Sequence, residues 1–153
     1  MKEIIAYEMS FKGTLNYEVD IICVPFEEKY WNEYMQIYND CFCEMRKDLG
    51  IEPINFYSDY SQMKDKINDT FICLQNGVII GAVSCYENEL DDLIVNKPFQ
   101  RQGLGKKLLL WGMYHIKEQG YDEITLHVAE WNRNAIKLYL KTGFDIKKKE
   151  KVR

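Results

Sequence analysis

A short glycine-bearing turn between a strand and a helix constrains the fold of this chain more than any other segment. The apolar run 93–95 (Leu-Ile-Val) is closed by Pro98, because proline cannot donate to a sheet ladder and is rare in central strands. The turn 100–105 (Gln-Arg-Gln-Gly-Leu-Gly) follows, and residues 106–111 continue as a helix-forming segment. The crossover from 89 to 129 predicts a parallel strand pair within a mixed sheet.

Such a turn is also suited to bind a phosphate group. Its backbone N–H groups point at one spot, where the helix dipole favours negative charge, and glycine lets a ligand approach the backbone closely. The spacing fits neither standard nucleotide fingerprint, because Leu108 replaces the third glycine of the dinucleotide pattern and Lys107 replaces the Ser or Thr of the P-loop. The turn alone predicts either a site for a different phosphate-bearing ligand or only a tight turn.

Composition is typical of one soluble globular domain, which we expect to span 1–153. The chain has 153 residues, of which 46% are hydrophobic and 29% charged. A net charge of −4 argues against nucleic acid as a partner, since nucleic-acid binding usually needs a basic field. We find no signal segment and no apolar run of about 20 residues, and therefore expect a cytoplasmic protein that contacts no membrane. The five cysteines and two histidines show no metal-binding spacing, so we expect no metal and no disulfide framework.

The rest of the pattern predicts strands and helices in the order β-α-α-β-β-β-α-β-α-β. Asn76-Gly77 joins two β-rich runs and is the strongest short hairpin signal. The N-terminal stretch 1–17 is ambiguous, and only Ile4 to Tyr7 suggests a strand within it. The expected helices cover 28–48, 58–67, 103–119 and 132–142, and the expected strands cover 19–24, 71–74, 78–85, 89–96, 124–129 and the segment from Phe144.

Two motifs in register resemble those of the GCN5-related N-acetyltransferase (GNAT) superfamily. The main family motif, Gln/Arg-x-x-Gly-x-Gly/Ala after a core strand, is matched by Gln100, Gly103 and Gly105. The second motif, Asn-x-x-Ala-x-x-x-Tyr-x-x-x-Gly-Phe, is matched by Asn132, Ala135, Tyr139, Gly143 and Phe144. The resemblance spans 19–145 and is close over 89–144.

The resemblance implies a fold and a co-substrate. The fold is α/β (α+β mixed), a mostly antiparallel mixed central sheet with a parallel, splayed strand pair and about four flanking helices. The co-substrate is acetyl-CoA, with its pyrophosphate on the backbone N–H groups of 102–106 and its pantetheine along 93–95. The implied binding residues are Leu93, Ile94, Val95, Gln100, Arg101, Gln102, Gly103, Leu104, Gly105, Lys106, Asn132 and Tyr139.

The resemblance also implies acetylation of a primary amine on a small molecule or a peptide. Such an amine is mostly protonated at neutral pH and must lose a proton before it attacks the thioester. Some family members carry a general-base glutamate, which Glu89 matches by its spacing to Gln100. Strand alternation puts Glu89 and Asp91 on one face and Asp92 on the other, and the whole acidic cluster (Glu87, Glu89, Asp91 and Asp92) equally fits an ordinary solvated turn.

Tyr139 stands where the family places the general acid that protonates the leaving thiolate. Its other interpretation is a core tyrosine on an apolar helix face. A backbone N–H of Ile94 or Val95 is positioned by the resemblance to stabilise the oxyanion. The acceptor site is expected to be shaped by the aromatic residues of 25–70, which are Tyr30, Trp31, Tyr34, Tyr38, Phe42, Phe56, Tyr57 and Tyr60.

One departure from the family pattern lies at the chain ends. Only ten residues remain from Phe144, enough for one strand where the family has two. We therefore expect Lys2 to Met9, from the same chain or from a second subunit of a homodimer, to fill the missing strand position. Two other functions stay open, a non-catalytic acyl-CoA-binding or regulatory module and a domain whose glycine turn is only structural.

Overall fold

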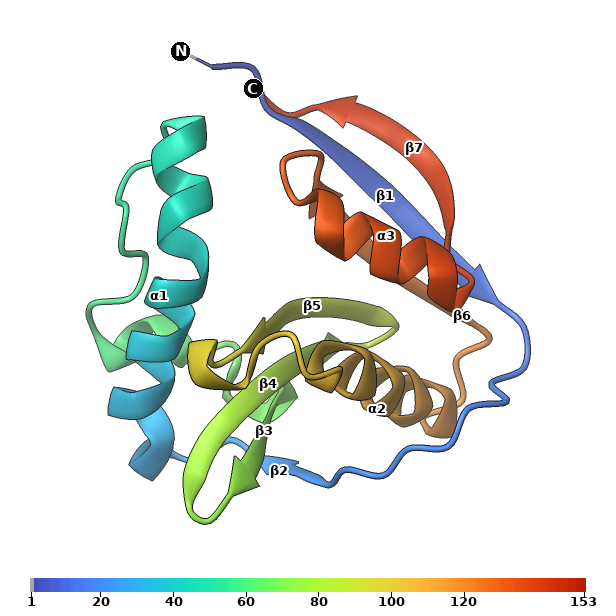
Figure 1. Ribbon diagram of the computed structural model, residues 1–153, viewed down its shortest axis with the longest axis horizontal. Coiled ribbons are helices and arrows are strands. Elements are labelled where there is room, and N and C mark those ends of the chain that lie inside the picture. Colours follow the sequence, from blue (N-terminus) through green and yellow to red (C-terminus); the bar gives the residue numbers. More distant parts are fainter. Residues whose placement is uncertain (1) are drawn as a thin grey trace.

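Seven strands form one mixed sheet in the computed structural model, which describes residues 2–153 (Figure 1). Their order across the sheet is β2-β3-β4-β5-β6-β1-β7. Neighbouring strands are antiparallel, except that β5 and β6 are parallel. The strands are β1 (Ile5–Lys12), β2 (Cys23–Pro25), β3 (Thr70–Gln75), β4 (Val78–Tyr86), β5 (Glu89–Val95), β6 (Glu123–Ala129) and β7 (Asp145–Lys151).

The α-helices of residues 2–153 cover both faces of this sheet. They are α1 (Trp31–Leu49), α2 (Leu104–Glu118) and α3 (Arg133–Thr142). Two successive residues of β4 show the division, because Ala82 is buried with tyrosines of α1 and Val83 is buried with Leu109 of α2. Helix α3 packs on the same cluster as α2, so α1 lies alone on its face (Figure 1). Within these residues, we find no helix that has the length and apolar character of a membrane span.

Two expected elements are corrected by the structure. The segment 58–67 forms short 3₁₀ turns, Tyr60–Met63 and Ile67–Asp69, so the sheet is flanked by fewer α-helices than expected. A capping box between Asp59 and Gln62 starts the first turn, but the segment is too short to propagate an α-helix. The strand expected at 19–24 shrinks to β2, because the preceding residues run along α2 instead, where Tyr114 Oη donates to the backbone carbonyl of Leu15 at 3.2 Å.

The N-terminal strand lies inside the sheet, between β6 and β7. It pairs with β6 from Ala6↔Ala129 to Lys12↔Glu123, and its other edge pairs with β7. Met9 is fully buried beneath α2 and α3. The two chain ends lie side by side (Figure 1), and Val152 N–H donates to the carbonyl of Ile4 at 2.8 Å. The prediction that the N-terminal segment supplies a strand here is confirmed, and the strand comes from the same chain.

Candidate active site

The two parallel strands diverge, as expected for a splayed pair. Their pairing is confined to Glu89↔Thr125 and Leu90↔Leu126. A bulge follows in β5, where the register against β4 shifts and Asp92 adopts a left-handed backbone with φ of 48°. The remainder of β5 is therefore turned away from β6, and its edge is left without a strand partner on that side.

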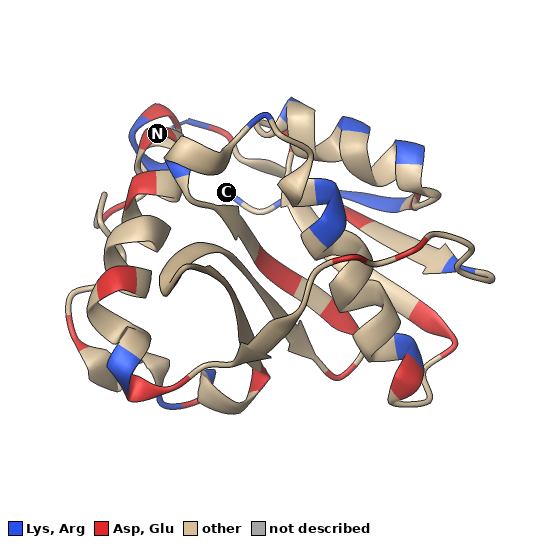
Figure 2. Cartoon of the chain, turned by 60° about the horizontal axis from the view of Figure 1, so that its bottom comes forward, with Lys and Arg blue, Asp and Glu red and all other residues tan. Residues whose placement is uncertain are grey.

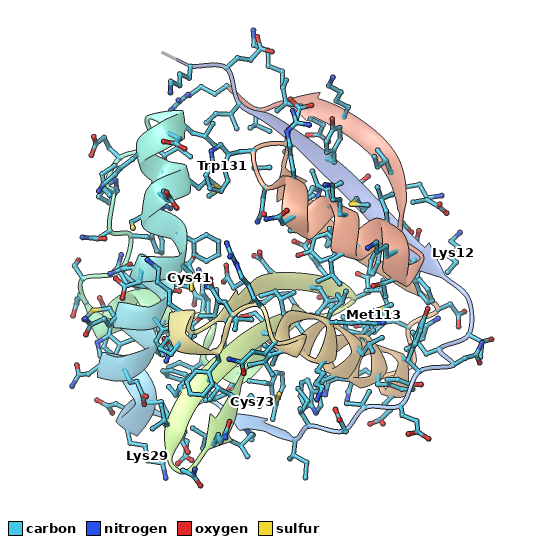
Figure 3. The ribbon with its side chains drawn as sticks, viewed as in Figure 1. Lys12, Lys29, Cys41, Cys73, Met113 and Trp131 are labelled. Atoms are coloured by element: carbon cyan, nitrogen blue, oxygen red, sulfur yellow. The ribbon has the colours of Figure 1, made fainter. Side chains whose placement is uncertain are left out.

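Two adjoining cavities, of about 260 and 300 Å³, occupy the space between the diverging strands. Both are lined by Phe42 of α1, Leu93 of β5 and Tyr139 of α3. The first extends to Asp92, and the second reaches Gly105 at the start of α2. Their shared walls make them one cleft, which connects the glycine turn to Tyr139 and Asp92. In Figure 3, Cys41 and Trp131, which line the second cavity, lie on α1 and just before α3.

The glycine turn presents the first turn of α2 to this cleft. Arg101 and Gly103 both have a left-handed backbone, with φ of 63° and 81°. Gly103 is the N-cap, and no side chain accepts a hydrogen bond from the first N–H groups of the helix. An α-helix leaves its first four N–H groups without an intrahelical partner, and the helix dipole is positive there. These N–H groups are therefore left without a side-chain partner at the end of the cleft, an arrangement that suits an anion.

Several polar side chains that the sequence assigned to the co-substrate make contacts within the protein. Gln100 Nε2 donates to the carbonyl of Val95 at 2.9 Å, which ties the turn to the end of β5. Lys106 Nζ lies 5.2 Å from the ring centroid of Tyr17. Asn132 is the N-cap of α3, where its Oδ1 accepts from Ala135 N–H at 3.3 Å, and it also lines both cavities.

Charged residues are spread along the chain, as Figure 2 shows with Lys and Arg in blue and Asp and Glu in red. Lys107, next to the glycine turn, forms an ion pair with Asp20 at 3.1 Å. Within residues 2–153, no three His, Cys, Asp or Glu side chains gather closely enough to hold a metal ion.

Tyr139 stands at the wall common to both cavities. Its ring packs against Phe144, with 5.9 Å between the ring centroids. Burial, reinforced by the negative charge of Asp91, raises the pKa of the Tyr139 hydroxyl to about 12. The hydroxyl is therefore protonated at neutral pH and can donate a proton within the cleft.

Glu89 lies outside both cavity walls. Its Oε2 is 3.7 Å from Nδ1 of His127, and Nε2 of the same histidine is 3.5 Å from Glu8 on β1. These side chains sit on the sheet face opposite α2 and α3 and are partly exposed, and His127 itself lines the first cavity. The structure thus brings Tyr139, Asn132 and the glycine turn together but leaves Glu89 apart from them.

Most of the aromatic residues expected at the acceptor site form a core beneath α1 instead. Tyr34 and Tyr57 are 1% and 2% exposed and pack with Ile72 and Ile94 of the sheet. Among the eight, only Tyr38 and Phe42 line the cleft.

Comparison with known proteins identifies the family. A sequence model described as the acetyltransferase (GNAT) family matches residues 31–144, which is well over half of the chain. The chain belongs to the GNAT family.

Individual relatives match this chain either over a short segment or at low sequence identity. A mycothiol acetyltransferase of Thermobifida fusca is 38% identical over 81 residues, which are 53% of this chain and 23% of that protein. N-alpha-acetyltransferase 30 of Schizosaccharomyces pombe is 26% identical over 133 residues, covering 81% of this chain and 83% of the relative. The chain thus spans less than a quarter of the length of the first of these relatives.

Solved structures of GNAT proteins share the fold. A GNAT acetyltransferase from Colwellia psychrerythraea superposes with a TM-score of 0.73 at 17% identity, covering 94% of this chain and 53% of the other. An aminoglycoside acetyltransferase from a soil metagenome gives 0.57 at 20% identity, covering 82% of this chain and 90% of the other.

Sequence reasoning did not single out Asp92 in this GNAT chain. It placed Asp92 on the face opposite Glu89 and Asp91 by strict alternation. The bulge interrupts that alternation, as shown by Leu90 and Ile94, which lie four residues apart yet pack in the α2 cluster and the α1 cluster respectively. Asp92 consequently reaches Tyr38 of α1, whose hydroxyl donates to Asp92 Oδ1 at 3.2 Å. Nothing in the local sequence marks the bulge beyond two adjacent aspartates inside a strand.

Proposed function

We propose that this protein transfers the acetyl group of acetyl-CoA to a primary amine. The observation that carries the proposal is the single cleft, which has an uncapped helix N-terminus at one end and a protonated tyrosine on the wall shared by its two cavities. This pairing suits a ligand with a phosphate at one end and a leaving group that needs a proton at the other. Membership of the GNAT family supports the same reaction class.

The residues present fit acetyl-CoA. The N–H groups of 102–106 are available for the pyrophosphate, and Gly105 forms part of the cavity wall, where a side chain would intrude. The open edge of β5 offers backbone groups of Leu93 and the Val95 N–H to the pantetheine amides, because the register pairs Ile94 with Ala82 and directs its backbone groups toward β4. The Val95 carbonyl already accepts from Gln100 Nε2 at 2.9 Å and from Cys41 Sγ at 3.3 Å, so we assign this carbonyl a positioning role.

Tyr139 supplies the acid for the leaving group in this proposal. The thiolate of CoA is a better leaving group when it is protonated as it departs, since an ordinary thiol has a pKa of about 8.5. The Tyr139 hydroxyl, with its pKa raised by burial to about 12, remains protonated at neutral pH, and Tyr139 forms part of the cleft wall. Of the two backbone N–H groups expected to act here, that of Ile94 is directed toward β4, so the Val95 N–H stabilises the negative charge on the acetyl oxygen.

An acceptor screen tests this function. Purified protein is given acetyl-CoA with spermidine, kanamycin or a lysine-containing peptide, and release of the CoA thiol is followed together with the mass of the amine. We expect transfer to at least one amine. If calorimetry detects CoA binding but no amine is acetylated, a non-catalytic acyl-CoA-binding module is favoured instead. If CoA does not bind at millimolar concentration, the glycine turn has only a structural role.

Replacing Tyr139 by Phe tests the acid. The variant keeps the ring that packs against Phe144 but loses the hydroxyl, so we expect turnover to fall by about 10²- to 10⁴-fold. Affinity for acetyl-CoA, measured by calorimetry, should change little. The matched control is Tyr121→Phe on the exposed surface. Equal turnover of the two variants across pH would remove Tyr139 from the mechanism.

A further inference from the structure

Asp92 is held in a left-handed backbone conformation in the wall of the first cavity. It is the bulged residue of β5, and its φ of 48° lies in the left-handed region, which aspartate adopts more readily than most non-glycine residues but which is uncommon inside a strand. Such strain persists only where the surroundings impose it, and it recurs at functional sites. The bulge turns the Asp92 side chain toward α1 and into the wall of the cavity that Tyr139 also lines.

The carboxyl group of Asp92 is only half satisfied. Its Oδ1 accepts the hydroxyl of Tyr38 at 3.2 Å, whereas its Oδ2 is buried and has no hydrogen-bond partner within residues 2–153. A buried carboxylate oxygen without a partner is costly, so a native structure that keeps one calls for an explanation. A ligand that donates to Oδ2 supplies such an explanation.

The surroundings of Asp92 make it basic. Burial, and to a smaller extent the negative charge of Asp91, raise the pKa of Asp92 to about 6. Lys66 and the hydrogen bond from Tyr38 act in the opposite direction but are the weaker effects. The ionisable groups that face it come from β5, α1, β4 and the segment between α1 and β3. They are Asp91, Tyr34, Tyr38, Tyr86, Tyr57 and Lys66.

We propose that Asp92 is the general base that deprotonates the acceptor amine, and that the acceptor ammonium binds against its free oxygen in the tyrosine-lined part of the cleft. This inference rests on the proposed function. It places the base and the acid, Asp92 and Tyr139, on the walls of one cavity, from β5 and α3. A cationic primary amine is the ligand that this combination of charge and aromatic rings favours.

The protons of the reaction balance with these two groups. Asp92, directly or through one water molecule, takes a proton from the ammonium, and the neutral nitrogen attacks the thioester carbon. As the carbon–nitrogen bond forms and the carbon–sulfur bond breaks, Tyr139 protonates the departing sulfur. The second proton of the nitrogen restores Tyr139, and Asp92 releases its proton to solvent. The net products are the amide, the CoA thiol and one proton.

The neighbouring carboxylates are less suited to this role. Glu89 faces His127 and lines neither cavity. Asp91 lines the same cavity as Asp92, but it is exposed and its Oδ1 accepts the backbone N–H of Asp92 at 2.8 Å, so it helps to hold the bulge. We therefore assign the base to Asp92 and a positioning role to Asp91.

The test is a pH profile of kcat/KM for Asp92→Asn, with Glu89→Gln as the matched control and the amine that wild type acetylates best among spermidine, kanamycin and a lysine peptide. The base acts only when deprotonated, so wild-type kcat/KM should rise through a pH of about 6. Asp92→Asn should lower kcat/KM by about 10²- to 10⁴-fold at neutral pH. Its kcat/KM should recover only near the pKa of the amine itself. Glu89→Gln should keep the wild-type profile.

Two outcomes separate the inference from the proposed function. If wild type transfers acetyl and Asp92→Asn shows the same pH profile, the base assignment is overturned and the function stands. The same holds if Glu89→Gln, rather than Asp92→Asn, loses the rise of kcat/KM through a pH of about 6. If wild type transfers to no amine, the function itself fails.

A carbon-13 NMR titration tests the inference without an acceptor. The carboxyl signal that is absent from Asp92→Asn should titrate near pH 6. Titration of that signal at the ordinary value of about 3.9 overturns the inference.

Discussion

At the residue scale, several departures from ordinary protein structure lie in and beside one cleft of this GNAT chain. Asp92 and Arg101 have left-handed backbones without being glycine, Asp92 Oδ2 is buried without a partner, and the pKa of Tyr139 is raised by burial. Each feature alone has a structural explanation. Their convergence on the walls and mouth of two connected cavities is typical of an active site.

Asp92 should also lower the stability of the fold. Its pKa rises from 3.8 to about 6 on folding, so the folded chain binds this proton more tightly than the unfolded chain. The stabilising effect of protonation is complete below a pH of about 4 and is lost as the pH rises through about 6. At pH 7 the charged carboxylate therefore costs about 2–3 kcal/mol.

Asp92→Asn is therefore expected to unfold at a higher urea concentration than wild type at pH 7, and this advantage should shrink as the pH falls toward 5. Denaturation at both pH values, followed by fluorescence, measures the difference. A variant that is less stable than wild type at pH 7 would show that the carboxylate has a partner that stabilises it.

At the element scale, the start of α2 combines two glycines with different roles. Gly103 has a φ of 81°, which only glycine adopts without strain, and a Cβ there meets nothing within 4 Å. Gly105 has no such backbone requirement, and a Cβ there lies 3.8 Å from Val95 Cγ2, an ordinary contact. The fold therefore does not require glycine at this position.

Alanine at these two positions should separate folding from binding. Gly105→Ala is expected to stabilise α2 by about 0.5–1 kcal/mol while weakening acetyl-CoA binding at least tenfold, because its methyl group enters the cleft. Gly103→Ala should weaken binding and also cost about 1–2 kcal/mol of stability. Thermal unfolding and calorimetry measure both. If Gly105→Ala binds acetyl-CoA like wild type, the pyrophosphate is held elsewhere.

The elements were predictable from the sequence where the signal is local. The Asn76-Gly77 hairpin, the helix from Leu104 and the motif positions of Asn132 and Tyr139 follow from turn chemistry and spacing. The bulge at Asp92 was not predictable from the sequence, because it depends on how β5 pairs with β4 and packs under α1. The tyrosines of 25–70 were assigned to the acceptor because aromatic side chains suit both cores and channels, and packing sends most of them to the core.

At the scale of the whole molecule, β1 joins the two ends of the chain into one half of the sheet. It pairs with β6 on one edge and with β7 on the other. Without β1, β7 would lose its only strand partner among residues 2–153, and the outer edge of β6 would be unpaired. The same half carries the Tyr139 wall of the cleft through α3. Arg153, at the C-terminal end, also donates to the carbonyl of Gly50 at 3.1 Å and so links this half to the end of α1.

Removal of residues 1–12 is therefore expected to abolish the cooperative thermal transition. A milder variant, Met9→Ala, deletes a fully buried side chain and should cost about 2–5 kcal/mol, with the exposed Lys12→Ala as control. Circular dichroism on heating follows both. A truncated protein that keeps its melting temperature would show that β1 is dispensable.

The central claim is that the cleft moves an acetyl group from acetyl-CoA to an amine. The most direct measurement compares, in one vessel, the CoA thiol released with the acetylated amine formed, for wild type and for Tyr139→Phe. We predict equal amounts of the two products with wild type and a strongly reduced rate with the variant. Thiol release without an acetylated amine, or CoA binding without either product, would contradict the account.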